Sequence, residues 1–287
     1  MGFSLYAALE KVANVVAMPV YTHFFLHEAL GREYGLRRAD KVRLLRRIRR
    51  NASSITSGTT WLEQLLLASY VLSLPRALKG DVVECGCFKG SSTASLSLVC
   101  EATDRRLVVC DSFEGLPEIG VEDKQHVSLH HQRYEEYRQG EYKGALEEVK
   151  ENIRRHGALE RCTFVKGYFE STLPALDCAP AFVFLDVDLH ASLRTCLLNL
   201  WPKLAEGGYL FTHEAQQLDY VRIFFDREWW RENLRSEAPG LVGAGCGLPA
   251  GLGAGTGLGY ALKLGPGFSV SDDPRFRLFC GEPQRVG

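Results

Sequence analysis

The stretch GDVVECGCFKGSST, residues 80–93, combines an acid with closely spaced glycines in a pattern that suits ligand binding. A short run with strand character ends at Glu84, and Gly86 and Gly90 follow within a turn. Glycine has no Cβ, so a ligand can approach its backbone closely. The spacing is neither the G-x-G-x-x-G dinucleotide fingerprint nor a G-K-[ST] phosphate loop. We therefore disfavour a pyrophosphate ligand and expect the acid to meet a ligand that carries an ammonium group.

A second acid follows the next apolar run, in VVCDSFEGLP at residues 108–117. Asp111 stands where an acid in dinucleotide-binding folds accepts hydrogen bonds from ribose hydroxyls. Taken alone, Asp111 is better explained as an ordinary acidic loop residue. Together with Glu84 and the glycine turn, it predicts an adenosine-containing ligand. An amino acid at the first turn and a ribose at the second suggest S-adenosylmethionine, which we predict as the cofactor.

Acids and an imidazole follow two later apolar runs. FVFLDVDLHAS delivers Asp186, and GGYLFTHEAQQ delivers His213 and Glu214. If the two runs are neighbouring strands, these three side chains come within reach of one another. Carboxylates and an imidazole can bind a divalent cation, and an oxygen-rich set suits Mg²⁺, Ca²⁺ or Mn²⁺. A hydrogen-bonded acid–histidine pair without a metal explains the same spacing equally well.

These residues need a sheet whose strands end at one edge. Short apolar runs alternate with segments of helical periodicity, the latter at 60–78 (ending near Pro75), 92–101, 144–156 and 192–204. This alternation predicts an α/β class: a Rossmann-like, mainly parallel sheet with helices on both faces. Ligands of such sheets bind at the carboxyl ends of the strands. We predict seven strands, the last two forming an antiparallel pair, at 81–84, 106–110, 162–166, 182–186, 209–212, 258–264 and 275–280.

We divide the chain into an N-terminal helical arm, 1–58, and a cofactor-binding domain, 59–287, which contains a lid or insertion at 118–143 and a glycine-rich loop at 239–259. The second half of the arm is rich in arginine. Such a run is more often a solvated helix face or a subunit contact than a surface for nucleic acid or phosphate. We expect the arm to form a homo-oligomer and, with the lid, to close over the second substrate.

The bulk composition is that of an ordinary globular protein, with 46% hydrophobic and 24% charged residues. A net charge of -1 implies no general attraction to nucleic acid or membranes, so we expect no nucleic-acid partner. The apolar run at 12–25 is interrupted by polar residues and a proline, which predicts neither a signal peptide nor a membrane span. Nine cysteines without a CxxC pair predict reduced thiols and a cytoplasmic protein.

Taken in this order, the motifs of residues 80–215 resemble those of the macrocin O-methyltransferase family, the TylF/MycF-type class I S-adenosylmethionine-dependent enzymes. VKGYFESTLP at 165–174 and LAEGGYLFTHEA also match. The resemblance implies methyl transfer to a hydroxyl of a small molecule, often a sugar of a natural product. It also implies a divalent metal, usually Mg²⁺, that grips vicinal hydroxyls of the acceptor.

The resemblance further implies where the cofactor lies. Glu84 and Gly86 would face its methionine part, and Asp111 and Ser112 its ribose. Asp186 would in addition be a metal ligand. The residues that we expect to bind the cofactor are Glu84, Cys85, Gly86, Lys89, Gly90, Ser91, Ser92, Asp111, Ser112, Asp186 and, beside the adenine, Tyr168 and Phe169.

Two positions depart from the family pattern. Many members have two consecutive aspartates where this chain has His213 and Glu214, so the metal is retained with a shifted geometry, changed toward Mn²⁺, or lost. His190 stands where the family commonly has tyrosine. A base must take the proton of the acceptor hydroxyl, and the candidates are Asp186, Asp188, His190 and His213. Two alternatives stay open: a metal-independent methyltransferase that uses a His/Glu base on another small molecule, and a non-catalytic cofactor-binding scaffold.

Overall fold

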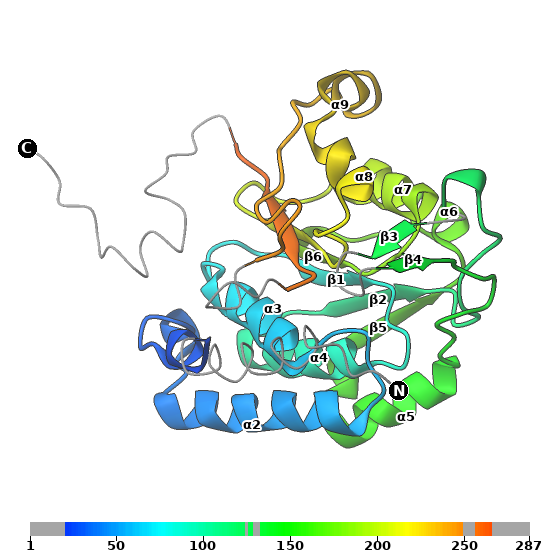
Figure 1. The fold of residues 1–287 in the computed structure, drawn as a ribbon. Coiled ribbons are helices and arrows are strands. Elements are labelled where there is room, and N and C mark those ends of the chain that lie inside the picture. The colour runs from blue at the N-terminus through cyan, green and yellow to red at the C-terminus, as the bar shows by residue number, and fades with distance from the viewer. Residues whose placement is uncertain (1–20, 124–125, 129–132, 249–255, 266–287) are drawn as a thin grey trace, which may run out of the picture.

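A mostly parallel sheet forms the centre of the protein (Figure 1). The computed structural model describes residues 21–123, 126–128, 133–248 and 256–265. Within them the sheet has six strands in the order β5-β2-β1-β6-β7-β8. All neighbours pair in parallel except β8, which runs antiparallel to β7. The strands are β1 (Asp81–Cys85), β2 (Leu107–Asp111), β5 (Cys162–Lys166), β6 (Pro180–Leu185), β7 (Tyr209–Thr212) and β8 (Gly259–Leu262).

The predicted α/β class is confirmed, and six predicted strands match observed ones to within two residues at each end. The predicted seventh strand at 275–280 lies outside the described residues. In the observed order, β1 lies between β2 and β6, so the chain reverses its direction of winding at β1. Sheets of this kind bind ligands at such a switch point, beyond the carboxyl ends of the strands.

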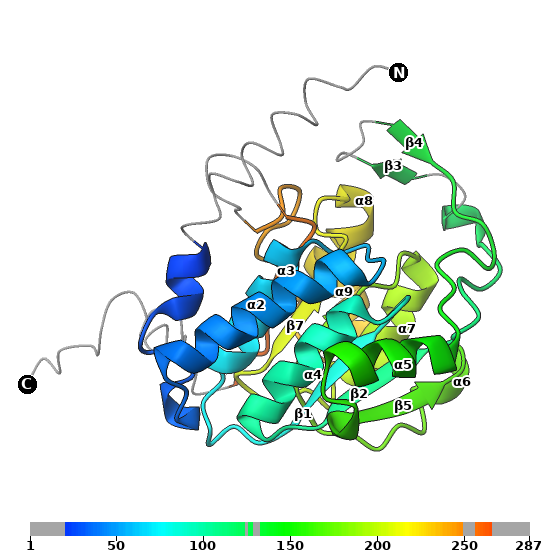
Figure 2. The same ribbon diagram turned by 90° about the horizontal axis from the view of Figure 1, so that it is seen from below.

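Two hydrophobic cores lie on opposite faces of the sheet, because successive side chains of a strand point to opposite sides. On β6, Phe182 and Phe184 enter one core, whereas Val183 and Leu185 enter the other. Figure 2 looks onto the helices of the first core. They are α2 (Arg38–Ser54), α3 (Trp61–Ser73), α4 (Ser91–Thr103) and α5 (Leu146–His156). The second core is covered by α7 (His190–Leu200), α8 (Leu218–Val221), η4 (Arg222–Phe225) and α9 (Arg227–Leu234).

The start of α3 is fixed by reciprocal capping. The Thr60 hydroxyl accepts from the Glu63 backbone N–H at 3.3 Å, and Glu63 Oε2 accepts from the Thr60 N–H at 2.7 Å. Both pairings satisfy donors that a helix N-terminus otherwise leaves unpaired. Thr60 thus caps α3, and the pairing brings the Glu63 carboxylate to the carboxyl edge of the sheet.

The described part of the predicted arm includes α2, which packs against α3 and α4. Leu44 and Ile48 of α2 join the first core, while most of its arginines are exposed. The boundary at residue 58 and the role of the arm in a homo-oligomer stay predictions. In the described residues, no helix combines the length and the apolar character needed to cross a membrane.

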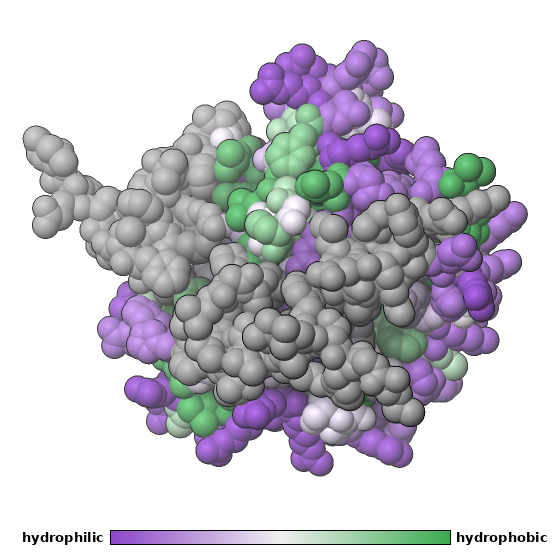
Figure 3. Space-filling view, viewed as in Figure 1, coloured by the Kyte–Doolittle hydropathy of each residue, from purple (hydrophilic) through white to green (hydrophobic). Residues whose placement is uncertain are grey.

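The region predicted as a lid contains structure that the sequence did not predict. It includes η2 (Val121–Asp123) and the antiparallel pair β3 (His126–Ser128) and β4 (Arg133–Glu135). On the face seen in Figure 3, hydrophilic residues cover much of the described surface, and an apolar area lies over β8 and the segment before it. In that segment, Val242 forms an isolated antiparallel bridge with Tyr260 of β8.

Candidate active site

A cavity of about 290 Å³ lies at the carboxyl ends of β1, β2, β6 and β7. Asp186 and His213 enter it because they directly follow β6 and β7 and continue the hydrogen-bonding of those strands. The cavity thus joins the glycine turn after β1 to the acids after β6. The sequence-predicted residues that line it are Gly86, Ser91, Ser92, Asp111, Ser112, Tyr168, Phe169, Asp186, Asp188 and His213.

The other predicted residues are not part of the lining formed by the described residues. Cys85 is buried in the second core, and Lys89 pairs with Glu148 of α5 at 3.0 Å. Gly90 faces Val149, since a Cβ there would lie 3.0 Å from its side chain. The remaining three are Glu84 and Glu214, which are buried, and His190, which pairs with Asp123.

Glu84 is a buried carboxylate at the end of β1. Within the described part of the chain, neither of its oxygens has a hydrogen-bond partner of normal geometry. Burial raises the pKa of Glu84 to about 7, although the nearby Ser92 and Thr93 hydroxyls partly oppose this. A buried carboxylate without a partner is costly. The position therefore suits a ligand that brings positive charge, as the sequence predicted.

Asp111 holds the glycine turn as well as lining the cavity. Its Oδ2 accepts from the Cys87 N–H at 2.7 Å, and its Oδ1 accepts from the Phe113 N–H at 2.6 Å. Burial nevertheless raises the pKa of this carboxyl above its usual value. Each carboxylate oxygen has a second lone pair, so both can still accept from ribose hydroxyls. The turn-holding role was not foreseen from the sequence.

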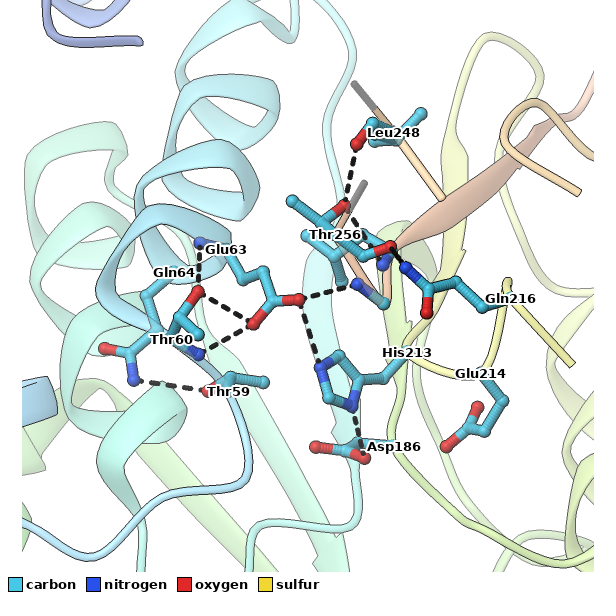
Figure 4. Close-up of polar contacts among 12 residues, drawn as sticks. Thr59, Thr60, Glu63, Gln64, Asp186, His213, Glu214, Gln216, Leu248 and Thr256 are labelled. Carbon is cyan, nitrogen blue, oxygen red and sulfur yellow. Dashed lines mark hydrogen bonds and ion pairs between the residues drawn. The ribbon is translucent and has the colours of Figure 1, made fainter. Parts of the chain in front are cut away.

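Asp186, His213 and Glu214 come together as predicted (Figure 4). One potential ligand atom of each lies within 4.8 Å of the others. His213 Nδ1 is 3.4 Å from Asp186 Oδ1. Glu214 Oε2 accepts from the Thr212 hydroxyl at 2.5 Å, which fixes the carboxylate. Two carboxylates and one imidazole fit a divalent cation, and the nitrogen donor makes Mn²⁺ or a later transition metal at least as suitable as Mg²⁺.

Charge is concentrated in this cluster. Burial disfavours charged His213, but Asp186 and Glu63 outweigh this and raise its pKa well above the usual range. Burial and the charge of Asp186 raise the pKa of Glu214. Burial also raises the pKa of Asp188, together with Asp186 and Glu214. Three acids and one imidazole thus share a small volume, in which a bound cation would offset the repulsion between the carboxylates.

Glu63 was missed by the sequence reasoning. Its Oε1 is 3.4 Å from His213 Nε2, so the imidazole lies between Glu63 and Asp186. Burial alone would raise the pKa of Glu63, but His213 and the backbone N–H groups of Thr60 and Gly257 lower it to about 2. Thr60 followed three residues later by Glu63 is a capping-box pattern, which could have placed Glu63 at the start of a helix. No local signal indicated that α3 faces the end of β7.

Aromatic residues of the lid region also form part of the wall and were not predicted individually. Tyr137 and Tyr142 line the cavity with Phe88. The ring centroids of Phe88 and Tyr142 are 5.9 Å apart, and those of Tyr137 and Tyr142 are 6.4 Å apart. Tyr137 lies close to Asp188, whose charge, after burial, is a cause of the raised pKa of the tyrosine. A wall of this kind suits the apolar face of an organic acceptor.

His190 is not part of the cavity lining formed by the described residues. Its Nδ1 pairs with Asp123 Oδ1 at 2.6 Å, and its ring contacts Tyr220 at a centroid distance of 5.3 Å. The hydrogen bond that the His190 ring donates to Asp123 raises the pKa of His190, while burial opposes this. His190 therefore fastens η2 to the start of α7 in this structure.

The whole-chain comparisons agree with these features. Residues 56–238 match the sequence profile of the family described as macrocin-O-methyltransferase (TylF). The chain belongs to this family. The resemblance inferred from the sequence motifs is thereby confirmed for the segment that carries the cavity.

Individual relatives cover less of the chain. An 8-demethyl-8-(2,3-dimethoxy-alpha-L-rhamnosyl)-tetracenomycin-C 4'-O-methyltransferase of Streptomyces olivaceus is 36% identical over 146 residues, 48% of this chain and 53% of the relative. A demethyldecarbamoylnovobiocin O-methyltransferase of Streptomyces niveus is 32% identical over 146 residues, 47% and 52% respectively. The chain thus spans about half the length of these curated relatives. The solved structure of the O-methyltransferase NovP has the same fold, with a TM-score of 0.57 at 24% identity over 73% of this chain and 84% of that one.

Proposed function

We propose that the chain is an S-adenosylmethionine-dependent O-methyltransferase that acts on a hydroxyl of a small molecule, most specifically on a sugar of a natural product. One observation carries the proposal: a single cavity joins the acid–glycine turn after β1 to the Asp186 cluster after β6 and β7. The first part suits a cofactor and the second a hydroxyl acceptor. Family membership supports methyl transfer to oxygen.

The sugar acceptor is supported by a relative's name. The Streptomyces olivaceus relative is named for a substrate with a rhamnosyl group. In the present chain, the aromatic wall of Phe88, Tyr137 and Tyr142 lies in the same cavity as Asp186. An apolar wall opposite polar groups can hold a sugar ring by its apolar face while its hydroxyls meet the acids.

Different residues of the chain would bind different parts of the cofactor. Bound S-adenosylmethionine supplies a sulfonium methyl group that can be displaced in line by an oxygen nucleophile. Glu84 would neutralise the ammonium group, and Asp111 would accept from the ribose hydroxyls. Tyr168 and Phe169 would flank the adenine. Asp111 also holds the glycine turn through the Cys87 N–H. A cofactor bound there would have a fixed position relative to the acids, and such positioning is a major source of rate.

The proposed chemistry on the acceptor hydroxyl depends on the cluster of Asp186, His213 and Glu214. Asp186, His213 and Glu214 would hold a divalent metal, whose Lewis acidity would lower the pKa of the acceptor hydroxyl. A base that lines the cavity would take the proton of this hydroxyl. Asp186, Asp188 and His213 meet that condition, whereas His190 is engaged with Asp123 outside the lining formed by the described residues. The role of His190 as the base is accordingly not part of the proposal.

The test combines binding with turnover. Metal-stripped full-length protein is titrated calorimetrically with S-adenosylhomocysteine, and transfer from methyl-labelled S-adenosylmethionine is then followed with rhamnosylated and sugar-free acceptors, with and without Mn²⁺ or Mg²⁺. We expect binding, and transfer to the rhamnosylated acceptors alone. Asp111→Ala would remove both contacts with the turn, whereas Asp111→Asn would keep one of them. Asp111→Asn, checked by circular dichroism, is therefore the milder variant and should weaken binding at least 10-fold.

Each alternative corresponds to a different result. Transfer that survives complete removal of metal would favour the metal-independent methyltransferase. Cofactor binding without transfer to any acceptor would favour the scaffold. The absence of cofactor binding under all conditions would overturn the proposal.

A further inference from the structure

Glu63 uses both carboxylate oxygens to join three parts of the chain. Oε2 accepts from the backbone N–H and the hydroxyl of Thr60, at 2.7 and 2.9 Å, at the start of α3. Oε1 accepts from the Gly257 N–H at 2.7 Å and lies 3.4 Å from His213 Nε2. The side chain is buried, so solvent does not compete for these contacts. Four donors therefore converge on one anchored carboxylate (Figure 4).

The imidazole of His213 is fixed on both of its edges. Nε2 faces Glu63, and Nδ1 faces Asp186, each at 3.4 Å. Gly257 lies directly against the Nε2 edge of the ring, because a Cβ at position 257 would be only 2.9 Å from His213 Nε2 and 3.0 Å from His213 Cδ2. The segment that carries Gly257 is held in turn by Gln216, whose Nε2 donates to Thr256 O at 3.0 Å. The ring cannot turn without disturbing one of these contacts.

We propose that Glu63 is a positioning residue for the metal site, because it holds the Nε2 edge of His213 and so presents Nδ1 to a cation shared with Asp186 and Glu214. The partner of one ring nitrogen decides which nitrogen remains available as a ligand. Carboxylates that hold metal-binding histidines in this way typically contribute 10- to 100-fold to metal affinity. The inference rests on the metal-assisted form of the proposed function.

Glu63 matters in this chain because position 213 is a histidine. An aspartate at that position would have no ring to orient, and a second buried carboxylate beside it would repel Glu63. The histidine and Glu63 therefore form a matched pair. Glu63 and His213 also connect the start of α3 and the segment around Gly257 to the proposed metal ligands. The cavity wall and these ligands are therefore positioned together.

Cobalt titration of the full chain, with S-adenosylhomocysteine binding as a control for folding, tests the pairing. Co²⁺ affinity is measured by calorimetry and by the visible spectrum of the bound ion in wild type, Glu63→Gln, His213→Asp and the double variant. We expect Glu63→Gln to lose 10- to 100-fold in Co²⁺ affinity and to change the spectrum. In the His213→Asp background, Glu63→Gln should change Co²⁺ affinity by less than 2-fold. Affinity for S-adenosylhomocysteine should stay within 2-fold in Glu63→Gln, because Glu63 is not part of the cavity lining formed by the described residues.

Thr60→Ala is the matched control for the helix cap, because it removes the hydroxyl contact with Oε2 and leaves the contacts of Oε1 in place. It should change Co²⁺ affinity by less than 2-fold. An equal loss in Thr60→Ala and Glu63→Gln would reduce Glu63 to a capping residue and overturn the inference. An equal effect of Glu63→Gln in the presence and absence of His213 would do the same. A wild-type protein that binds no Co²⁺ would also overturn it, whereas cofactor binding and methyl transfer test the proposed function separately.

Discussion

Glu84 shows how one buried group can make stability depend on pH. The pKa of its carboxyl is about 7 in the folded chain against an ordinary value of 4.5. A raised acid pKa means that the unfolded state loses its proton first, so the free energy of unfolding falls between pH 4.5 and pH 7 and stays lower above that. The shift corresponds to about 3 kcal/mol.

Glu84→Gln should therefore remove this dependence. Without cofactor, we expect wild type and variant to unfold at similar urea concentrations at pH 5. At pH 8 the variant should be more stable by up to about 3 kcal/mol, because no buried charge forms. The variant should also bind S-adenosylhomocysteine at least 10-fold more weakly at pH 8. Parallel pH profiles of stability in the two proteins would contradict the assignment.

A second prediction at the scale of a single residue concerns Gly86. Its φ is 83°, and a Cβ would lie 1.9 Å from the Asp186 carbonyl oxygen. Gly207 has a similar φ of 79° but no neighbouring atom within 4 Å of a Cβ, among the described residues. Gly207→Ala should cost only the conformational strain, about 1–2 kcal/mol. Gly86→Ala should cost clearly more in urea unfolding and abolish cofactor binding; equal costs would argue against the close approach of the two loops.

At the scale of elements, η2 is fastened to α7 by two contacts of unequal strength. Asp123 accepts from both the backbone N–H and the ring of His190, at 2.9 and 2.6 Å. Asp219 and the ring of Tyr220 approach the same imidazole from α8. The second contact, between Glu122 and Arg194, is exposed and contributes little. Attachment of this part of the lid region thus depends mainly on His190.

The attachment should weaken at alkaline pH. The bond to Asp123 raises the pKa of His190 although burial opposes this. A raised histidine pKa contributes stability that is complete below the ordinary value of 6.5 and is lost as pH rises through the folded value. Limited proteolysis within residues 118–143 should therefore be faster at pH 9 than at pH 6, after correction for protease activity on a denatured substrate. Asp123→Asn should abolish the difference, and Glu122→Gln should preserve it; the reverse result would assign the attachment to the exposed pair.

At the scale of the whole molecule, the features that could be predicted from the sequence are those that short local patterns determine, namely the strands and the residues at their ends. Runs such as FVFL in β6 are apolar throughout because parallel strands are buried on both faces, so the strands and the residues at their ends could be located. The Asp186 cluster followed from neighbouring strand ends. Glu63 could not be predicted, because its contact with His213 joins α3 to a strand end far along the chain. The short helices α8 and α9 were not predicted either, because 4 and 8 residues, about one and two turns, give too few apolar repeats.

The cavity wall draws on segments from Thr56 to Gln217, so a ligand that fills it can bind only the folded chain. S-adenosylhomocysteine at 100 times its dissociation constant should then stabilise the fold by about 2.7 kcal/mol. For a domain of this size, that corresponds to a rise in melting temperature of roughly 5–10 °C. Adenosine and methionine, each at the same concentration, should give much smaller shifts, because Asp111 and Glu84 hold opposite ends of one molecule. A full shift with adenosine alone would show that Glu84 takes no part in binding, and no shift with S-adenosylhomocysteine would show that the cavity is not a cofactor site.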